Sequence, residues 1–72
     1  MCGIIGINSN KSVSATIINS LKKLEYRGYD SAGIATLSNG LINEVKSEGR
    51  VDNLEKNSVV QNMEGTIGIG HV

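Results

Sequence analysis

The residue with the clearest chemical potential is Cys2, the only cysteine of the chain, which directly follows the initiator methionine. Met1 is expected to be removed before a residue as small as cysteine, and its removal would give Cys2 both a thiol and a free α-amino group. A thiol needs a base to become the reactive thiolate, and an α-amino group titrates at about pH 7.7 to 8, where a general base works well. Cys2 is therefore a candidate nucleophile that uses its own amine as the base. The alternative is a small buried hydrophobic residue, the common role of a lone cysteine.

A second candidate site is the run LEYRGYDSAG at residues 24–33. It places two tyrosines, an arginine, an aspartate and a serine between an expected helix and an expected strand. One interpretation is a helix C-cap at Gly28 followed by a loop whose polar groups satisfy one another. The other is the wall of a pocket, in which Arg27 binds a carboxylate or lowers the pKa of a nearby thiol. The residues leave both interpretations open.

The third candidate is His71, the only histidine, which ends the run GIGH at residues 68–71. A single histidine at a strand end is usually structural, and a dyad of Cys2 and His71 is the functional alternative. Nothing in the sequence fixes the distance between these two residues. The glycines before His71 do not form a phosphate-binding loop, because no helix follows to offer its N-terminus.

The elements that must position these residues alternate between strand and helix patterns. Residues 2–7 have apolar side chains on both parities and predict a buried strand. An amphipathic helix is predicted over 13–26, with Ser12 as its N-cap and Gly28 at its C-cap. Asn39 and Gly40 predict a tight hairpin between strands at 31–37 and 41–47. A surface helix over 51–63 and a buried strand over 65–72 complete the pattern.

The order β-α-β-β-α-β predicts an α+β fold with an antiparallel sheet and one or two packed helices, in which one face of the sheet stays exposed. With 72 residues the chain holds at most one domain. One cysteine excludes an internal disulfide, and one histidine with one cysteine argues against a structural zinc site.

The charge pattern excludes several classes of function. Seven basic and seven acidic residues give no net charge and no basic patch, so nucleic-acid binding is not expected. No apolar run approaches the ~20 residues of a membrane span, and the first residues do not resemble a secretory signal. A free thiol without an export signal predicts a cytoplasmic protein.

Three segments together resemble one known family. The start CGIIG at residues 2–6, the run at 24–33 and GIGH at 68–71 are similar to the beginning of the glutaminase domain in the glucosamine–fructose-6-phosphate aminotransferase (isomerising) family. This family belongs to the class II, N-terminal-nucleophile glutamine amidotransferases. The run YRGYDSAG at 26–33 is specific to it, since amidophosphoribosyltransferases of the same class differ there. The resemblance extends over the whole chain.

The resemblance implies a fold, a reaction and site residues. The implied fold is part of an N-terminal-nucleophile hydrolase αββα sandwich. In the implied reaction, Cys2 attacks the side-chain amide of L-glutamine, ammonia leaves for amino-sugar (glucosamine 6-phosphate) synthesis, and water releases glutamate. Arg27 and Gly28 are expected in the substrate pocket wall beside Cys2. No metal or other cofactor is needed for glutamine hydrolysis in this family.

The chain departs from the family at its end, where Val72 replaces the first threonine of the family motif Thr-Arg-Trp-Ala-Thr-His-Gly. In the family, the arginine of this motif binds the glutamine carboxylate, and later segments supply an Asn-Gly oxyanion hole and an aspartate for the substrate amine. Loss of one oxyanion donor alone costs about 10² to 10³ in rate. Residues 1–72 are therefore expected to be a truncated glutamine amidotransferase type-2 domain with lost or feeble catalysis. The alternatives are a non-enzymatic fragment that associates with a second chain completing the domain, and a non-functional remnant.

Overall fold

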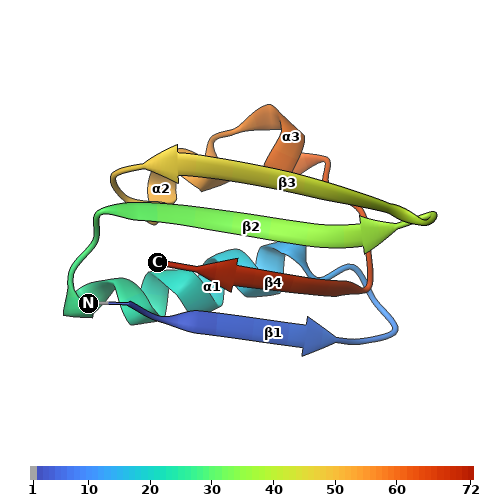
Figure 1. Ribbon diagram of the computed structural model, residues 1–72, viewed down its shortest axis with the longest axis horizontal. Helices are drawn as coiled ribbons and strands as arrows, with labels where there is room; N and C mark the ends of the chain where they lie inside the picture. Colours follow the sequence, from blue (N-terminus) through green and yellow to red (C-terminus); the bar gives the residue numbers. More distant parts are fainter. Residues whose placement is uncertain (1) are drawn as a thin grey trace.

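The computed structural model describes residues 2–72, and of Arg27 only the backbone. It contains one four-stranded sheet whose helices lie on one side (Figure 1). The elements follow one another as β1 (Ile4–Asn8), α1 (Ser14–Leu24), the 3₁₀ helix η1 (Glu25–Arg27), β2 (Ser31–Ser38), β3 (Leu41–Glu48), α2 (Val51–Glu55), α3 (Ser58–Gln61) and β4 (Ile67–His71). The expected α+β class is confirmed.

The sheet has the strand order β1-β4-β2-β3, and each neighbouring pair is antiparallel. The last strand therefore lies between the first and the second, which leaves β1 and β3 at the edges (Figure 1). The hairpin between β2 and β3 is confirmed, because Asn39 and Gly40 both have positive φ, at 53° and 76°. Two successive residues of positive φ give the turn whose twist matches that of paired strands.

The core lies between the sheet and α1, α2 and α3. Ile17, Leu21 and Leu54 are fully buried there, and Ile34 of β2 is 2% exposed. The whole buried apolar set is Val13, Ile17, Ile18, Leu21, Ala32, Ile34, Val51, Leu54, Val60 and Met63. The helical spacing of the apolar residues in α1 thus identified the face of the helix that packs on the sheet.

The predicted N-cap of the first helix, Ser12, was wrong. The helix begins at Ser14 after Val13, and no side chain caps it. Tertiary hydrogen bonds fix this end instead, since the Val13 N–H donates to the Gly65 carbonyl (3.0 Å) and the Ser14 hydroxyl donates to the Met63 carbonyl (3.4 Å). A local capping rule based on Ser12 could not anticipate these partners, which are about 50 residues away.

The single helix predicted over 51–63 is two short helices, α2 and α3. Asn57 separates them, and its side-chain oxygen accepts hydrogen bonds from the N–H groups of Val59 (2.8 Å) and Val60 (3.4 Å). An asparagine in this role starts a new helix, because its side chain satisfies N–H groups that have no partner within the helix.

The burial predicted for the first and last strands of the sequence was wrong. Residues of β1 alternate between exposed and half-buried, and in β4 the isoleucines are exposed while Gly68 and Gly70 are buried. The glycines face α1, which approaches so closely that a Cβ on Gly70 would lie 2.6 Å from Ile17 Cγ2. The alternation of glycine and isoleucine in β4 therefore points its apolar side chains away from the helices.

Those isoleucines belong to an exposed apolar surface on the side of the sheet opposite the helices, as expected. We call it the open face. Its large apolar side chains are Ile4 (83% exposed), Ile42 (74%), Ile69 (64%), Leu37 (45%) and Ile67 (40%). The register joins them, since Leu37 lies between Ile42 and Ile67 in adjacent strands. Among the described residues, no helix has the length and apolar character required to cross a membrane.

Candidate functional site

The structure places Cys2 just ahead of the edge strand β1, with its free thiol exposed. Two hydrogen bonds extend the β1–β4 pairing to this end, from the Gly3 N–H to the Val72 carbonyl (3.1 Å) and from the Val72 N–H to the Gly3 carbonyl (2.9 Å). A Cβ on Gly3 would lie 3.0 Å from Leu24 Cδ1, so Gly3 faces α1. Side chains alternate along a strand, and Cys2 therefore lies on the side of the open face. The alternative of a buried cysteine is wrong.

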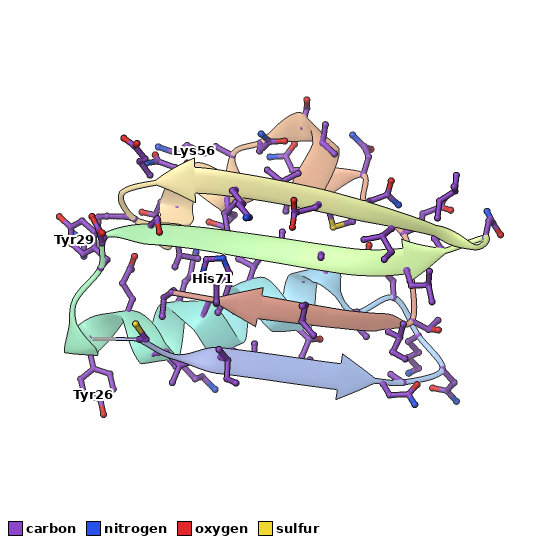
Figure 2. All side chains as sticks on the ribbon, viewed as in Figure 1. Tyr26, Tyr29, Lys56 and His71 are labelled. Carbon is purple, nitrogen blue, oxygen red and sulfur yellow. The ribbon has the colours of Figure 1, made fainter. Side chains whose placement is uncertain are left out.

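His71 lies on the same face, across from Ile4 on one side and Gly33 on the other. Its imidazole leans over Gly33, where an added Cβ would collide with Nε2. Figure 2 shows the ring rising from the end of β4 toward β2. Since Cys2 precedes β1, on the other side of β4, the ring leans away from the thiol. Among residues 2–72 no hydrogen bond joins the two side chains, and the structure therefore does not support a dyad of Cys2 and His71.

The imidazole of His71 instead belongs to a polar end of the open face. Together with Glu44 and Lys46 of β3 it lines a hollow of about 180 Å³ over Gly33. Lys46 packs against the same glycine, because its Cγ would lie 3.3 Å from an added Cβ. The open face thus carries a carboxylate, an ammonium group and an imidazole beside its apolar side chains, toward the end where Cys2 lies.

The run at residues 24–33 passes from α1 to β2 at this same end of the sheet (Figure 1). Gly28 closes η1 with φ of 114°, and its N–H donates to the Glu25 carbonyl (2.9 Å). Gly28 was predicted to cap the helix over 13–26, but α1 ends at Leu24 with Glu25 as its C-cap, and Gly28 caps η1 instead. The backbone of Arg27 lies within η1, while its side chain lies outside the described part of the structure. The two tyrosines point outward, with Tyr26 83% and Tyr29 51% exposed (Figure 2).

Sequence reasoning missed the partners of this run. The Glu25 carboxylate accepts a hydrogen bond from the Val51 N–H at the start of α2 (2.7 Å) and lies 4.0 Å from the Arg50 guanidinium. The Arg50 guanidinium also lies over the ring of Tyr29, 4.9 Å from its centroid. These partners are separated by about 25 positions in the chain, so no local pattern could have indicated them.

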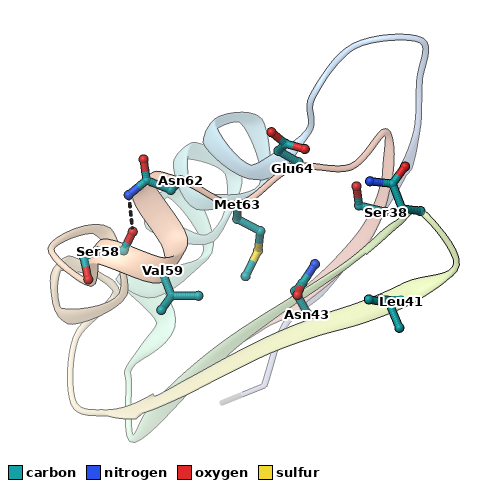
Figure 3. A pocket seen from close by; sticks show the side chains of 9 residues that line it. Ser38, Leu41, Asn43, Ser58, Val59, Asn62, Met63 and Glu64 are labelled. Atoms are coloured by element: carbon teal, nitrogen blue, oxygen red, sulfur yellow. Dashed lines mark hydrogen bonds between the residues drawn. The ribbon is translucent and has the colours of Figure 1, made fainter.

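A larger hollow than the one over Gly33 lies between the hairpin end of the sheet and α3 (Figure 3). Its volume is about 500 Å³, and it is lined by Ser38, Asn39, Leu41, Asn43, Ser58, Val59, Asn62, Met63 and Glu64. None of the predicted site residues borders it. Within residues 2–72, His, Cys, Asp and Glu side chains form no group of three that could hold a metal ion.

An antiparallel sheet with helices on one face and a cysteine ahead of its edge strand is compatible with part of an N-terminal-nucleophile hydrolase sandwich. No family model matches the chain. Curated relatives do match it over 71 residues, which is 99% of the chain. They are glutamine–fructose-6-phosphate aminotransferases (isomerising) from Brucella abortus (55% identical), Bartonella quintana (51%) and Mesorhizobium japonicum (49%). The chain is therefore similar to the N-terminal segment of these aminotransferases, and it spans 12% of their length.

Proposed function

We propose that residues 1–72 are the nucleophile-bearing part of a class II glutaminase domain. Cys2, freed of Met1, attacks the side-chain amide carbon of L-glutamine through its sulfur. The carbon–nitrogen bond then breaks, and the α-amino group of Cys2 carries a proton from the thiol to the departing ammonia. Water next cleaves the thioester to release glutamate and the free thiol. The ammonia serves amino-sugar synthesis.

The observation that carries this proposal is the exposed thiol of Cys2, held by the Gly3–Val72 pairing at the polar end of the open face. Catalysis by a thiol requires access for the substrate, and exposure provides it. Arg27 and Gly28 belong to the same end, because Leu24 packs against Gly3. We assign these two residues to the wall of the glutamine pocket. The printed names of the relatives, which specify glutamine as a substrate, support the choice of substrate.

The same structure supports only feeble activity for these 72 residues alone. The open face next to Cys2 has no second layer, so solvent reaches the thiol from that side. An oxyanion intermediate is stabilised mainly by fixed donors in a site from which water is excluded. We therefore propose that the remaining groups of the site lie outside residues 1–72.

The test is the intact mass of the purified chain before and after treatment with an electrophilic glutamine analogue. The expected result is loss of Met1 and a single adduct, which excess glutamine suppresses and the Cys2→Ala variant lacks. Retention of Met1, or an adduct that glutamine does not suppress, would contradict the assignment of Cys2 as a glutaminase nucleophile.

A second candidate function is association with a chain that completes the domain. Five large apolar side chains on the open face and the unpaired edges of β1 and β3 favour it, since contiguous exposed apolar surface marks interaction sites. The experiment mixes this chain with the remainder of the glutaminase domain of the Brucella abortus relative. Binding should be weakened by Ile69→Lys on the open face. The matched control is Val59→Lys on α3, which changes an apolar residue of similar exposure (56%, against 64% for Ile69). Equal binding by both variants would exclude the open face as the binding surface for the second chain.

A further inference from the structure

Two loops that are far apart in the sequence are joined by hydrogen bonds at the end of the sheet where Cys2 lies. One is the segment 25–30, which carries the proposed pocket wall, and the other is the turn 49–51 between β3 and α2. Besides the Val51 N–H bond to Glu25, the Gly49 N–H donates to the Asp30 carbonyl (2.8 Å). The first segment is therefore held at both of its ends by the second.

Side-chain contacts between the two loops come from three residues, Glu25, Tyr29 and Arg50. We call this group the carboxylate latch. The Glu25 side chain is only 13% exposed, while that of Arg50 is 61% exposed and bridges the carboxylate and the Tyr29 ring. The two Glu25 oxygens have separate partners, since Oε2 accepts from the Val51 N–H and Oε1 faces Arg50. A carboxylate with a charged partner and a backbone donor is held more firmly than a neutral acceptor would be.

The latch holds the start of the segment that carries Gly28, through the Val51 N–H bond to Glu25. Gly28 is exposed, and its positive φ of 114° is a backbone conformation that glycine tolerates. On its N-terminal side the segment is continuous with Leu24, which packs against Gly3 next to Cys2. Any displacement of Glu25 would therefore move residues 27–28 relative to the nucleophile.

We infer that Glu25 is a positioning residue, which acts through the carboxylate latch to hold residues 27–28 beside Cys2. The inference rests on the proposed function where it concerns the glutamine pocket. Beyond that function, it states that the β3–α2 turn, through Arg50 and Val51, determines the geometry of the pocket wall. The latch uses the backbone N–H of Val51 and no side chain of the buried core, so its loss should alter the pocket wall without unfolding the sheet.

The experiment compares Glu25→Ala, Glu25→Gln and the control Glu55→Ala. This control removes a half-exposed carboxylate of α2 that pairs with Lys22. The first readout is the amide signals of Gly28 and Gly49 by NMR in the full chain. Glu25→Ala should shift both signals and speed their hydrogen exchange about tenfold. Glu25→Gln, which keeps an acceptor for the Val51 N–H, should restore most of the protection, and Glu55→Ala should change neither signal.

The second readout is the rate of Cys2 labelling by the electrophilic glutamine analogue, divided by its rate with iodoacetamide. A positioning role predicts that Glu25→Ala lowers this ratio while the iodoacetamide rate is unchanged, and that Glu25→Gln restores it. Unchanged Gly28 and Gly49 signals in Glu25→Ala would overturn the inference, as would an unchanged ratio. If wild-type labelling is not suppressed by glutamine, the proposed function fails, and the amide signals alone then decide whether the latch holds the segment.

Discussion

Substitution of Gly70 by alanine should destabilise the fold strongly, because α1 lies directly on this position of β4. An added Cβ would lie 2.6 Å from Ile17 Cγ2 and 3.1 Å from Leu21 Cδ1. Both neighbouring side chains are 0% exposed and sit in the centre of the core. Neither can turn away without creating a clash or a void elsewhere, so the helix itself must move outward.

The size of the effect follows from two opposing contributions. Inserting a methyl group into a packed core costs about 1–3 kcal/mol, and the two close contacts favour the upper part of that range. Replacing glycine by alanine also reduces the entropy of the unfolded chain, which offsets about 0.4–1 kcal/mol. The expected net loss is about 1–2 kcal/mol in the free energy of unfolding, a large share of the few kcal/mol available to so small a core.

The matched control is Gly6→Ala, on the adjacent strand β1. There the nearest atom to an added Cβ is Ile69 Cγ2 at 3.9 Å, an ordinary contact on the open face. This variant should equal or slightly exceed the wild type in stability. Urea unfolding followed by far-ultraviolet circular dichroism measures both variants, and with a slope of about 1 kcal/mol/M the Gly70→Ala midpoint should fall by about 1–2 M. Equal midpoints for the two variants would refute the close packing of α1 on β4.

Three smaller perturbations test other parts of the fold. The side-chain hydrogen bond to Glu55 raises the pKa of Lys22 above its ordinary value of 10.5, against the effect of desolvation. The stability that this pair contributes is therefore complete below pH 10.5 and is lost as pH rises through the higher pKa of the folded state. Over that rise, the difference in unfolding free energy between wild type and Lys22→Met should shrink. Urea unfolding repeated at several pH values measures it. Asn57→Ala should lose about 1 kcal/mol and selectively speed amide exchange in α3, because the side chain caps that helix. Gly40→Val should cost about 1–2 kcal/mol in thermal unfolding, since φ is 76° and open space around the residue leaves only backbone strain. A loss as small as that of an exposed Val59→Ala control would contradict this origin.

The features that local chemistry determines were predictable from the sequence. Asn39 and Gly40 specify a two-residue turn whatever surrounds them, and the strands on either side follow from it. The spacing of Ile17 and Leu21 likewise marks the buried face of α1 without knowledge of its partner. The reactivity of Cys2 stays a prediction from its place in the chain, and the structure shows only that this residue is exposed.

Features that depend on which segments meet in space were not predictable from one sequence. A strand of alternating glycine and isoleucine is consistent with either parity facing the helices, and the close approach of α1 selects the glycines of β4. In the same way, Glu25 in its own segment looks like an ordinary solvated helix-end residue. Only the folded chain brings it to the N–H of Val51, a contact that spans 26 positions.

The open face and the candidate site adjoin each other, so a partner that covers one also affects the other. The apolar side chains of β1, β2, β3 and β4 are continuous with the polar end formed by Glu44, Lys46 and His71. A second layer that buries Ile69 must extend to this end, because Ile69 and His71 are alternate residues of one strand and share the hollow over Gly33. Under the proposed function, the same contact that removes the apolar face from water also excludes water from the side of Cys2. Completion of the fold and activation of the nucleophile should therefore occur together, and Ile69→Lys should reduce glutamate release by the assembled domain in proportion to the loss of binding.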